Sequence, residues 1–214
     1  MAGHEYSAAD ITVLEFDAAV LQRPALYFGA GPDDPGFPAV ALSAVARHAL
    51  HPAPRVAAEH SLSVRIDILG DLRFRLTMNQ PHTWRDSPPP GYFGSLLGAE
   101  WWLPAAVAVL CTETSVEMWR GGRGFRQELA GLRPLAAPRA YEPPDGSGTR
   151  IAFALDPRRL PAGSVLPGGL EGLDPHGRNC AAPGRPGLLT VRDHRPMTER
   201  RRDVSRGPAS PPAL

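Results

Sequence analysis

The stretch "LSVRIDILGDLRFRLTM", residues 62–78, carries the clearest structural signal in the sequence. Apolar and polar residues alternate on both sides of a Gly70-Asp71 pair. The apolar set is Leu62, Val64, Ile66 and Ile68 before the pair, and Leu72, Phe74, Leu76 and Met78 after it. Alternation of this kind indicates strands with one buried face, and Gly-Asp is suited to the turn between them. We therefore predict an antiparallel hairpin over residues 62–78.

Residues 11–50, which precede this hairpin, have helical character. Apolar side chains recur at helical spacing from residue 11 up to the Arg23-Pro24 pair, where we expect the first helix to end. A loop, "GAGPDDPG" (29–36), then separates it from a second predicted helix that starts at Phe37 and includes "FPAVALSAVARHAL" (37–50).

The chain after the hairpin adds one helix and three strands to the prediction. A Pro-rich loop, "NQPHTWRDSPPPGYFG" (79–94), leads to an apolar helix at 103–111. A second hairpin follows at 115–129 around "RGGRG", and a strand at 149–155. Helices grouped against mostly antiparallel strands predict an α/β fold, a two-layer sandwich with a mixed, mostly antiparallel sheet backed by helices.

Composition divides the chain into three parts: a flexible arm at 1–8, a domain at 9–166 and a tail at 167–214. The tail has no Phe, Trp or Tyr and carries eight arginines against five acids. It buries too little apolar surface to offset its ordering entropy, so we expect it to be unstructured. Its positive charge leaves nucleic-acid contact open, alongside a solvated tail or the remnant of a longer gene.

Charge and cysteine content exclude several classes of protein. All 23 basic residues are arginine, which GC-rich coding explains without reference to function, and Cys111 and Cys180 form neither a disulfide framework nor a zinc motif. The longest apolar stretch, residues 101–111, is too short to cross a bilayer, and the first ten residues lack a signal-peptide pattern. We expect a cytoplasmic protein without membrane contact.

Three segments resemble one family. The segment "ADITVLEFDAAVLQRPALYFGAG" (9–31) is similar to the start of the ATPase domain of the DNA gyrase B subunit and other type II topoisomerases, with Arg23, Pro24, Tyr27 and Gly29 at matching positions. "VEMWRGGRGFRQEL" (116–129) and "GSGTRIAFALDPRRL" (146–160) resemble a later hairpin and strand of that domain. The resemblance implies the Bergerat-type sandwich of the GHKL ATPases, with ATP and Mg²⁺ on the helical side of the sheet.

The resemblance also shows which parts of an ATPase site are missing. The family's general-base Glu falls on Ser43 or Ala44, and its Mg²⁺-binding Asn on Arg47 or His48. The adenine-binding Asp falls near Leu76 or Thr77. In the expected glycine lid, Gly94 and Gly98 remain, followed by Trp101 and Trp102 where phosphates need room.

Four residues remain as candidates for nucleotide contact. Gly148 and Thr149 match the family's Gly-Thr that supports the adenine site, Arg120 matches an arginine at the pocket rim, and Arg47 could pair with a triphosphate. A strand start and a hairpin end explain the first three without any ligand. We predict no catalytic residue and no metal site, since His48 and His51 have no paired acid.

We therefore predict a degenerate ATPase domain that acts as a scaffold for another protein, with no cofactor and no autonomous topoisomerase activity. The alternative is a divergent ATP-binding subunit that needs a partner for hydrolysis. In that alternative an acid from elsewhere, with Glu100 nearest in the sequence, would reach the helix at 37–50.

Overall fold

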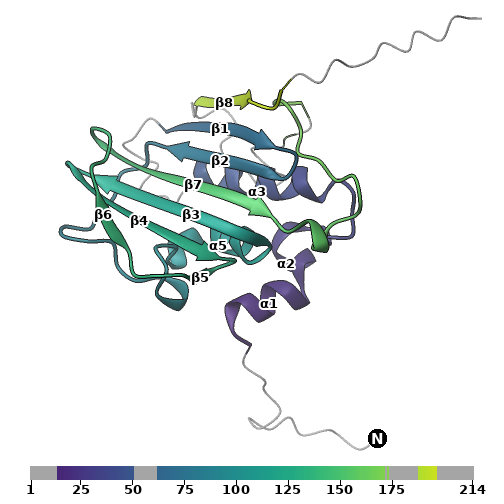
Figure 1. Ribbon diagram of the computed structural model, residues 1–214, viewed down its shortest axis with the longest axis horizontal. Helices are drawn as coiled ribbons and strands as arrows, with labels where there is room; N and C mark the ends of the chain where they lie inside the picture. The colour runs from purple at the N-terminus through teal and green to yellow at the C-terminus, as the bar shows by residue number, and fades with distance from the viewer. Residues whose placement is uncertain (1–13, 51–61, 172, 174–187, 197–214) are drawn as a thin grey trace, which may run out of the picture.

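The computed structural model describes residues 14–50, 62–171, 173 and 188–196 (Figure 1). The arm expected at residues 1–8 lies outside this range. The described chain forms an α/β fold built on one eight-stranded sheet, in the order β5-β4-β3-β7-β2-β1-β8, with β6 paired to β4. The strands are β1 (Ser63–Gly70), β2 (Arg73–Met78), β3 (Cys111–Arg120), β4 (Arg123–Ala130), β5 (Arg133–Pro134), β6 (Arg139–Tyr141), β7 (Ser147–Leu155) and β8 (Leu188–Asp193).

The sheet is mixed and mostly antiparallel, as predicted. The first predicted hairpin is β1–β2, in which Val64 pairs with Met78 and Ile68 with Phe74. The second is β3–β4, whose Gly121-Gly122 turn has φ values of 56° and 78°. Both values lie in the left-handed region, which glycine adopts without strain, so the two glycines close a tight hairpin that fits the twist of its strands.

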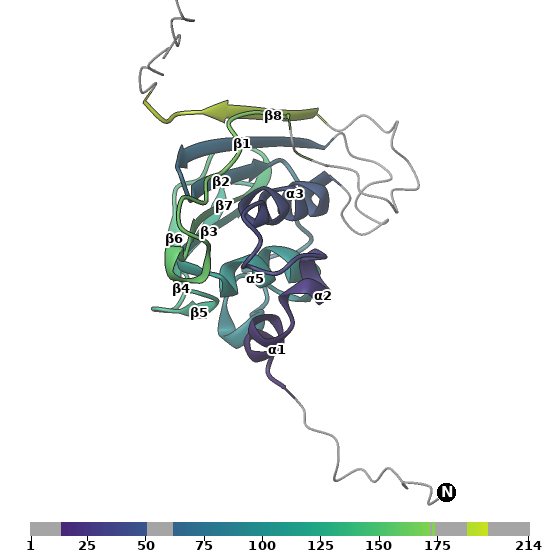
Figure 2. The same cartoon turned by 90° about the vertical axis from the view of Figure 1, so that its right-hand side faces the viewer.

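The main helices cover one face of the sheet (Figure 2). They are α1 (Phe16–Gln22), α2 (Pro24–Phe28), α3 (Phe37–Leu50) and α5 (Trp102–Val109), with short 3-10 turns η2 (Tyr92–Gly94), η3 (Ala99–Trp101) and η4 (Pro157–Arg159). α2 was not predicted. Arg23 leaves the helical conformation at φ −137°, and Pro24 starts a new helix because its missing N–H is not needed there.

The hydrophobic core lies between the helices and the inner side chains of β1, β2, β3 and β7. On α3 the buried residues Ala41, Val45 and Ala49 are small, which lets this helix approach the sheet closely. Across β2 and β7 the rings of Phe74 and Phe153 stack with centroids 4.9 Å apart. The apolar residues of the alternating pattern in residues 62–78 therefore lie on the face of the sheet that the helices cover.

Strand β8 corrects the expectation that residues 167–214 are unstructured. It runs parallel to β1, with Ser63 beside Leu188 and Ile68 beside Asp193. Its inner side chains Leu189 and Val191 pack on the core, which offsets part of the cost of ordering this Pro- and Gly-rich region. Compositional reasoning averaged over the tail and missed this short apolar segment.

Candidate functional site at the start of strand β7

Two of the four candidate residues, Gly148 and Thr149, lie at the start of β7, between β2 and β3. Thr149 pairs with Met78 of β2 and Met118 of β3, and it is fully buried. A Cβ atom on Gly148 would lie 2.6 Å from the Met78 carbonyl oxygen and would overlap the Trp119 ring. The glycine therefore serves the close packing of three strands and an indole ring, which does not involve a ligand.

His82, from the loop after β2, contacts both residues. Its Nε2 lies 2.8 Å from the Thr149 hydroxyl oxygen and 3.1 Å from the Gly148 carbonyl oxygen. Because a carbonyl oxygen only accepts, we assign the proton to Nε2, which donates to Gly148. The backbone N–H of His82 also donates to the Ser147 hydroxyl, at 3.1 Å. The threonine that the resemblance places under an adenine-binding Asp thus faces a histidine.

The buried position of His82 makes its imidazole neutral at pH 7. Burial lowers the pKa of His82 to about 4, the hydrogen bond to the Gly148 carbonyl raises it in part, and the positive charge of Arg120 lowers it further. A neutral ring can remain in this apolar setting without a carboxylate partner.

Aromatic rings continue from His82 toward the helical layer. The His82 ring centroid lies 6.2 Å from that of Trp101, which in turn lies 6.0 Å from the ring of His48 on α3. Trp101 is 2% exposed. We call His82, Trp101 and His48 the aromatic row; it occupies the space between the start of β7 and α3, where the resemblance implies a nucleotide.

His48 is fixed within the aromatic row by a backbone contact. Its Nε2 lies 2.8 Å from the Glu100 carbonyl oxygen. Burial lowers the pKa of His48, and the bond to Glu100 opposes this effect. His48 stands at one of the two positions matched to the family's Mg²⁺-binding Asn, and here the side chain packs against tryptophan.

The two candidate arginines differ in their setting. Arg120, at the end of β3, is exposed, and its Nη1 donates to the Trp84 carbonyl oxygen at 2.6 Å, so it holds the loop that carries His82. Arg47 is partly buried on the last turn of α3, one residue before His48. The structure thus gathers Gly148, Thr149 and Arg120 around the His82 loop, whereas Arg47 comes from the helical layer.

Helix α3 supplies no carboxylate to this region. Ser43 and Ala44, at the position of the family's general base, are buried, and no Asp or Glu occurs between Phe37 and Leu50. The backbone carbonyl oxygen of Glu100 contacts His48 of α3, but the Glu100 side chain is exposed to solvent. The carboxylate that the sequence analysis named as a candidate to reach α3 is therefore on the rim of the region and not inside it.

In the segment expected to form a glycine lid, backbone N–H groups donate to acceptors of the protein itself. The N–H of Gly91 donates to Ser95 O at 2.7 Å, and that of Tyr92 to Leu97 O at 2.9 Å. The N–H of Leu96 donates to the Gln127 side-chain oxygen at 2.8 Å. These groups, which in a lid would point at phosphates, are satisfied by the protein.

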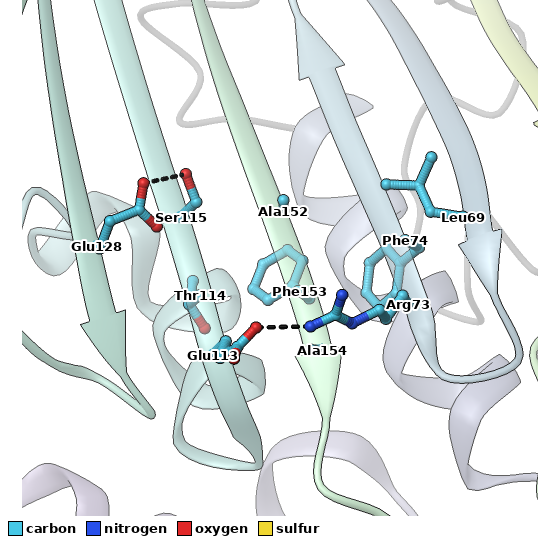
Figure 3. A pocket seen from close by; sticks show the side chains of 10 residues that line it. All are labelled: Leu69, Arg73, Phe74, Glu113, Thr114, Ser115, Glu128, Ala152, Phe153 and Ala154. Atoms are coloured by element: carbon cyan, nitrogen blue, oxygen red, sulfur yellow. Dashed lines mark hydrogen bonds and ion pairs between the residues drawn. The ribbon is translucent and has the colours of Figure 1, made fainter.

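The depressions on the described surface include two that differ in size and in lining. One, of about 540 Å³, is lined by the 80–90 loop and Glu100, and neither Thr149 nor any α3 residue lines it. The other, of about 160 Å³, lies on the face of the sheet opposite the helices, over Ala152 and Ala154 (Figure 3). Within the described ranges no group of three or more His, Cys, Asp or Glu side chains is arranged to hold a metal ion.

Comparison with known proteins gives no family assignment. The chain matches no protein-family model and no curated protein. In the part of the chain that the structure covers, none of the helices combines the length and apolar character needed to cross a membrane.

Proposed function

We propose that this protein is a degenerate gyrase B-type GHKL domain that acts as a binding scaffold and does not hydrolyse ATP. Its three matching segments, and a mixed sheet with helices on one face, support the family assignment. The observation that carries the loss of activity is the aromatic row, with His82 bonded to Thr149 and Trp101 packed toward α3. Close packing of this kind leaves no room for a nucleotide between Thr149 and α3.

The chemistry of the surrounding residues agrees with this proposal. A general base contributes about 10²- to 10⁴-fold to a hydrolysis rate, and α3 carries no acid that could serve as one. A hard cation needs oxygen ligands, and the aligned positions hold Arg47 and His48. Several independent parts of an ATPase are thus absent together, which favours a protein-binding role, with another protein as the partner.

One observation favours the second candidate function, a divergent ATP-binding subunit that a partner completes. Glu100 lies beside α3 and lines the depression of about 540 Å³, so an acid is present at the rim. A partner that rearranged the 80–90 loop could bring this carboxylate toward α3. In that case the Thr149 hydroxyl would have to exchange His82 for a nucleotide.

Steady-state phosphate release tests the proposal. We expect wild-type protein with ATP and Mg²⁺ to release phosphate no faster than Thr149→Val, which keeps the shape of the side chain and removes its hydroxyl. Release above that of the variant would contradict the scaffold proposal, and so would release that requires Glu100, measured with Glu100→Gln.

A further inference from the structure

The face of the sheet opposite the helices carries a row of arginines. Side chains that neighbour one another across the strands lie in one line, which runs from β1 through β2, β7, β3 and β4 to β6. In order, its members are Arg65, Thr77, Arg150, Glu117, Arg126 and Arg139. We call this set the basic row. It has four arginines and one acid and, with strands about 4.8 Å apart, it spans about 24 Å.

Two acids of this face, Glu117 and Asp67, lie deeper than the arginines that they bond. Glu117 is 13% exposed and bonds Arg150 at 2.6 Å and Arg126 at 3.7 Å, whose side chains are 29% and 42% exposed. In the neighbouring line, Asp67 is 3% exposed beneath Arg65 and Arg75, which are 40% and 35% exposed. Each of these carboxylates is thus shared by two arginines. Asp67 with Arg65 and Arg75 has a net charge of +1, whereas Arg126 also bonds Glu128, which balances the charge of the group around Glu117.

The remaining acids of the face lie to one side of the basic row. Glu113 bonds Arg73 at 2.6 Å, and Glu128 bonds Ser115 (Figure 3). Glu128 also bonds Arg126. On β7, Ala152 and Ala154 follow Arg150 and form the floor of the shallow depression there. The positive charge is therefore concentrated along the row, and the neighbouring lines are mixed.

The aromatic content of this face argues against single-stranded nucleic acid. Trp119 is buried against Arg150, at 5.6 Å from its guanidinium carbon, and its ring is not available for stacking. Proteins that hold single strands combine positive charge with exposed aromatic rings. Tyr141, paired with Gly124 on the same face, is half-buried, so the described residues of this face include no fully exposed aromatic ring. A surface that offers mainly charge fits the phosphate backbone of a duplex, which needs no contact with the bases.

We infer that the basic row on the open face of the sheet is a sequence-independent binding surface for the phosphate backbone of double-stranded DNA. Arginine guanidinium groups suit phosphate oxygens in geometry as well as in charge. This surface is separate from the aromatic row, so the inference does not depend on whether the protein binds a nucleotide.

The test uses the full chain and fluorescence anisotropy with a labelled duplex of about 20 base pairs of mixed sequence, at salt from about 50 to about 200 mM. With three or four phosphates contacted, the logarithm of the affinity should fall against the logarithm of the salt concentration with a slope of about −3. The double variant Arg65→Gln/Arg126→Gln leaves Asp67 bonded to Arg75 and Glu117 bonded to Arg150. We expect it to weaken binding about tenfold or more at the lowest salt and to reduce the slope by about 2.

The matched control is Arg23→Gln/Arg158→Gln, which removes the same charge away from the open face. Arg158 is one of two arginines bonded to the buried Asp156, so this variant also leaves its acid paired, with Arg159. We expect it to bind within about twofold of wild type, because none of its changes lies under the duplex. Thermal unfolding of both variants checks that each is folded.

Five results would overturn the inference. Three concern the duplex itself: no binding at the lowest salt, an equal loss in the control variant, and binding that survives Arg65→Gln/Arg126→Gln unchanged, which would assign it to other arginines of the chain. The fourth is equal or tighter binding of the labelled single strand. The fifth is displacement of the duplex by poly-glutamate as effective as by unlabelled duplex; either of these last two would assign the surface to a different ligand.

Discussion

At the scale of single residues, the contact between His82 and Thr149 decides how the candidate site is interpreted. Thr149 could be selected from the sequence because it follows a glycine at a strand start in a family-like segment. His82 could not, because it stands in a Pro-rich loop, and the contact joins residues 67 positions apart. No local pattern marks a loop residue that folds back onto a strand, so the sequence alone predicted tryptophans in this region but not His82.

The buried state of His82 predicts a specific loss of stability in acid. Its folded-state pKa of about 4 lies below the ordinary value of 6.5, so the unfolded chain binds more protons between these values. The contribution is complete above about pH 6.5 and falls by about 3 kcal/mol on the way to pH 4. Urea unfolding at pH 7 and about pH 4.5 should show a smaller loss for His82→Gln than for wild type. Equal acid sensitivity of the two proteins would contradict this prediction, and His48, whose pKa burial also lowers, is retained in both.

Asp67 predicts a second loss of stability in acid. Here the fold favours the charged form of the group, whereas at His82 it favours the neutral form. Burial raises the pKa of Asp67, but hydrogen bonds from His194 and Arg75 and the charge of Arg65 outweigh it, so the pKa is held below its usual value. Its contribution is present above the ordinary carboxyl pKa and is lost as pH falls through the lowered one. We expect Asp67→Asn to cost about 2 kcal/mol at pH 7, because two arginines lose their buried partner, and the cost should shrink at about pH 3.

Glu113→Gln is the control for Asp67→Asn. Glu113 lies on the same face and also bonds an arginine, but its side chain and that of Arg73 are both exposed to water. An exposed pair contributes less than about 1 kcal/mol. Equal effects of the two substitutions in urea unfolding would show that burial of Asp67 does not matter.

At the scale of elements, the hairpins could be predicted and the edge of the sheet could not. Strict alternation and a glycine turn set the register of β1–β2 and β3–β4. β5 and β6 are two and three residues long, too short to produce a pattern. β8 is surrounded by Pro and Gly, and its pairing with β1 depends on contacts more than a hundred residues apart, which composition does not report.

Hydrogen exchange tests the pairing of β8. The N–H of Leu188 donates to Leu62 O at 3.0 Å, and that of His194 to Ile68 O at 2.9 Å. We expect the amides at both ends of β8 to exchange about 100-fold or more slowly than exposed amides, and faster than that of Ile151 in the central strand β7. Exchange of the β8 amides at the rate of an unstructured chain would contradict the pairing.

Gly148 tests whether the three-strand packing at the start of β7 needs a glycine. An alanine there would press on the Trp119 ring and the Met78 carbonyl oxygen, and overpacking of this kind costs about 1–3 kcal/mol. Gly169→Ala is the control, because no atom lies within 4 Å of the added methyl group. If Gly148→Ala unfolded in urea at the same concentration as the control, the close approach described here would be wrong.

At the scale of the whole molecule, one sheet separates the two surfaces on which the proposals rest. The helical side holds the aromatic row, in the place where the resemblance implies ATP, and the open side holds the basic row. The two-layer arrangement could be predicted from the order of helices and strands. The packing of the aromatic row between the start of β7 and α3 could be predicted only in part, through Trp101. It depends on side chains from distant parts of the sequence that come into contact only in the folded protein.

The most direct test of the scaffold proposal is a thermal shift with ATP, with and without Mg²⁺. A ligand at a hundred times its dissociation constant stabilises a fold by about 2.7 kcal/mol, a rise of several degrees in a domain of this size. We predict no shift in either condition, because His82 and Trp101 occupy the space. A Mg²⁺-dependent shift would contradict the account. So would a Mg²⁺-independent shift that Arg47→Ala abolishes and the exposed-site control Arg23→Ala does not, since that result would identify a nucleotide sensor.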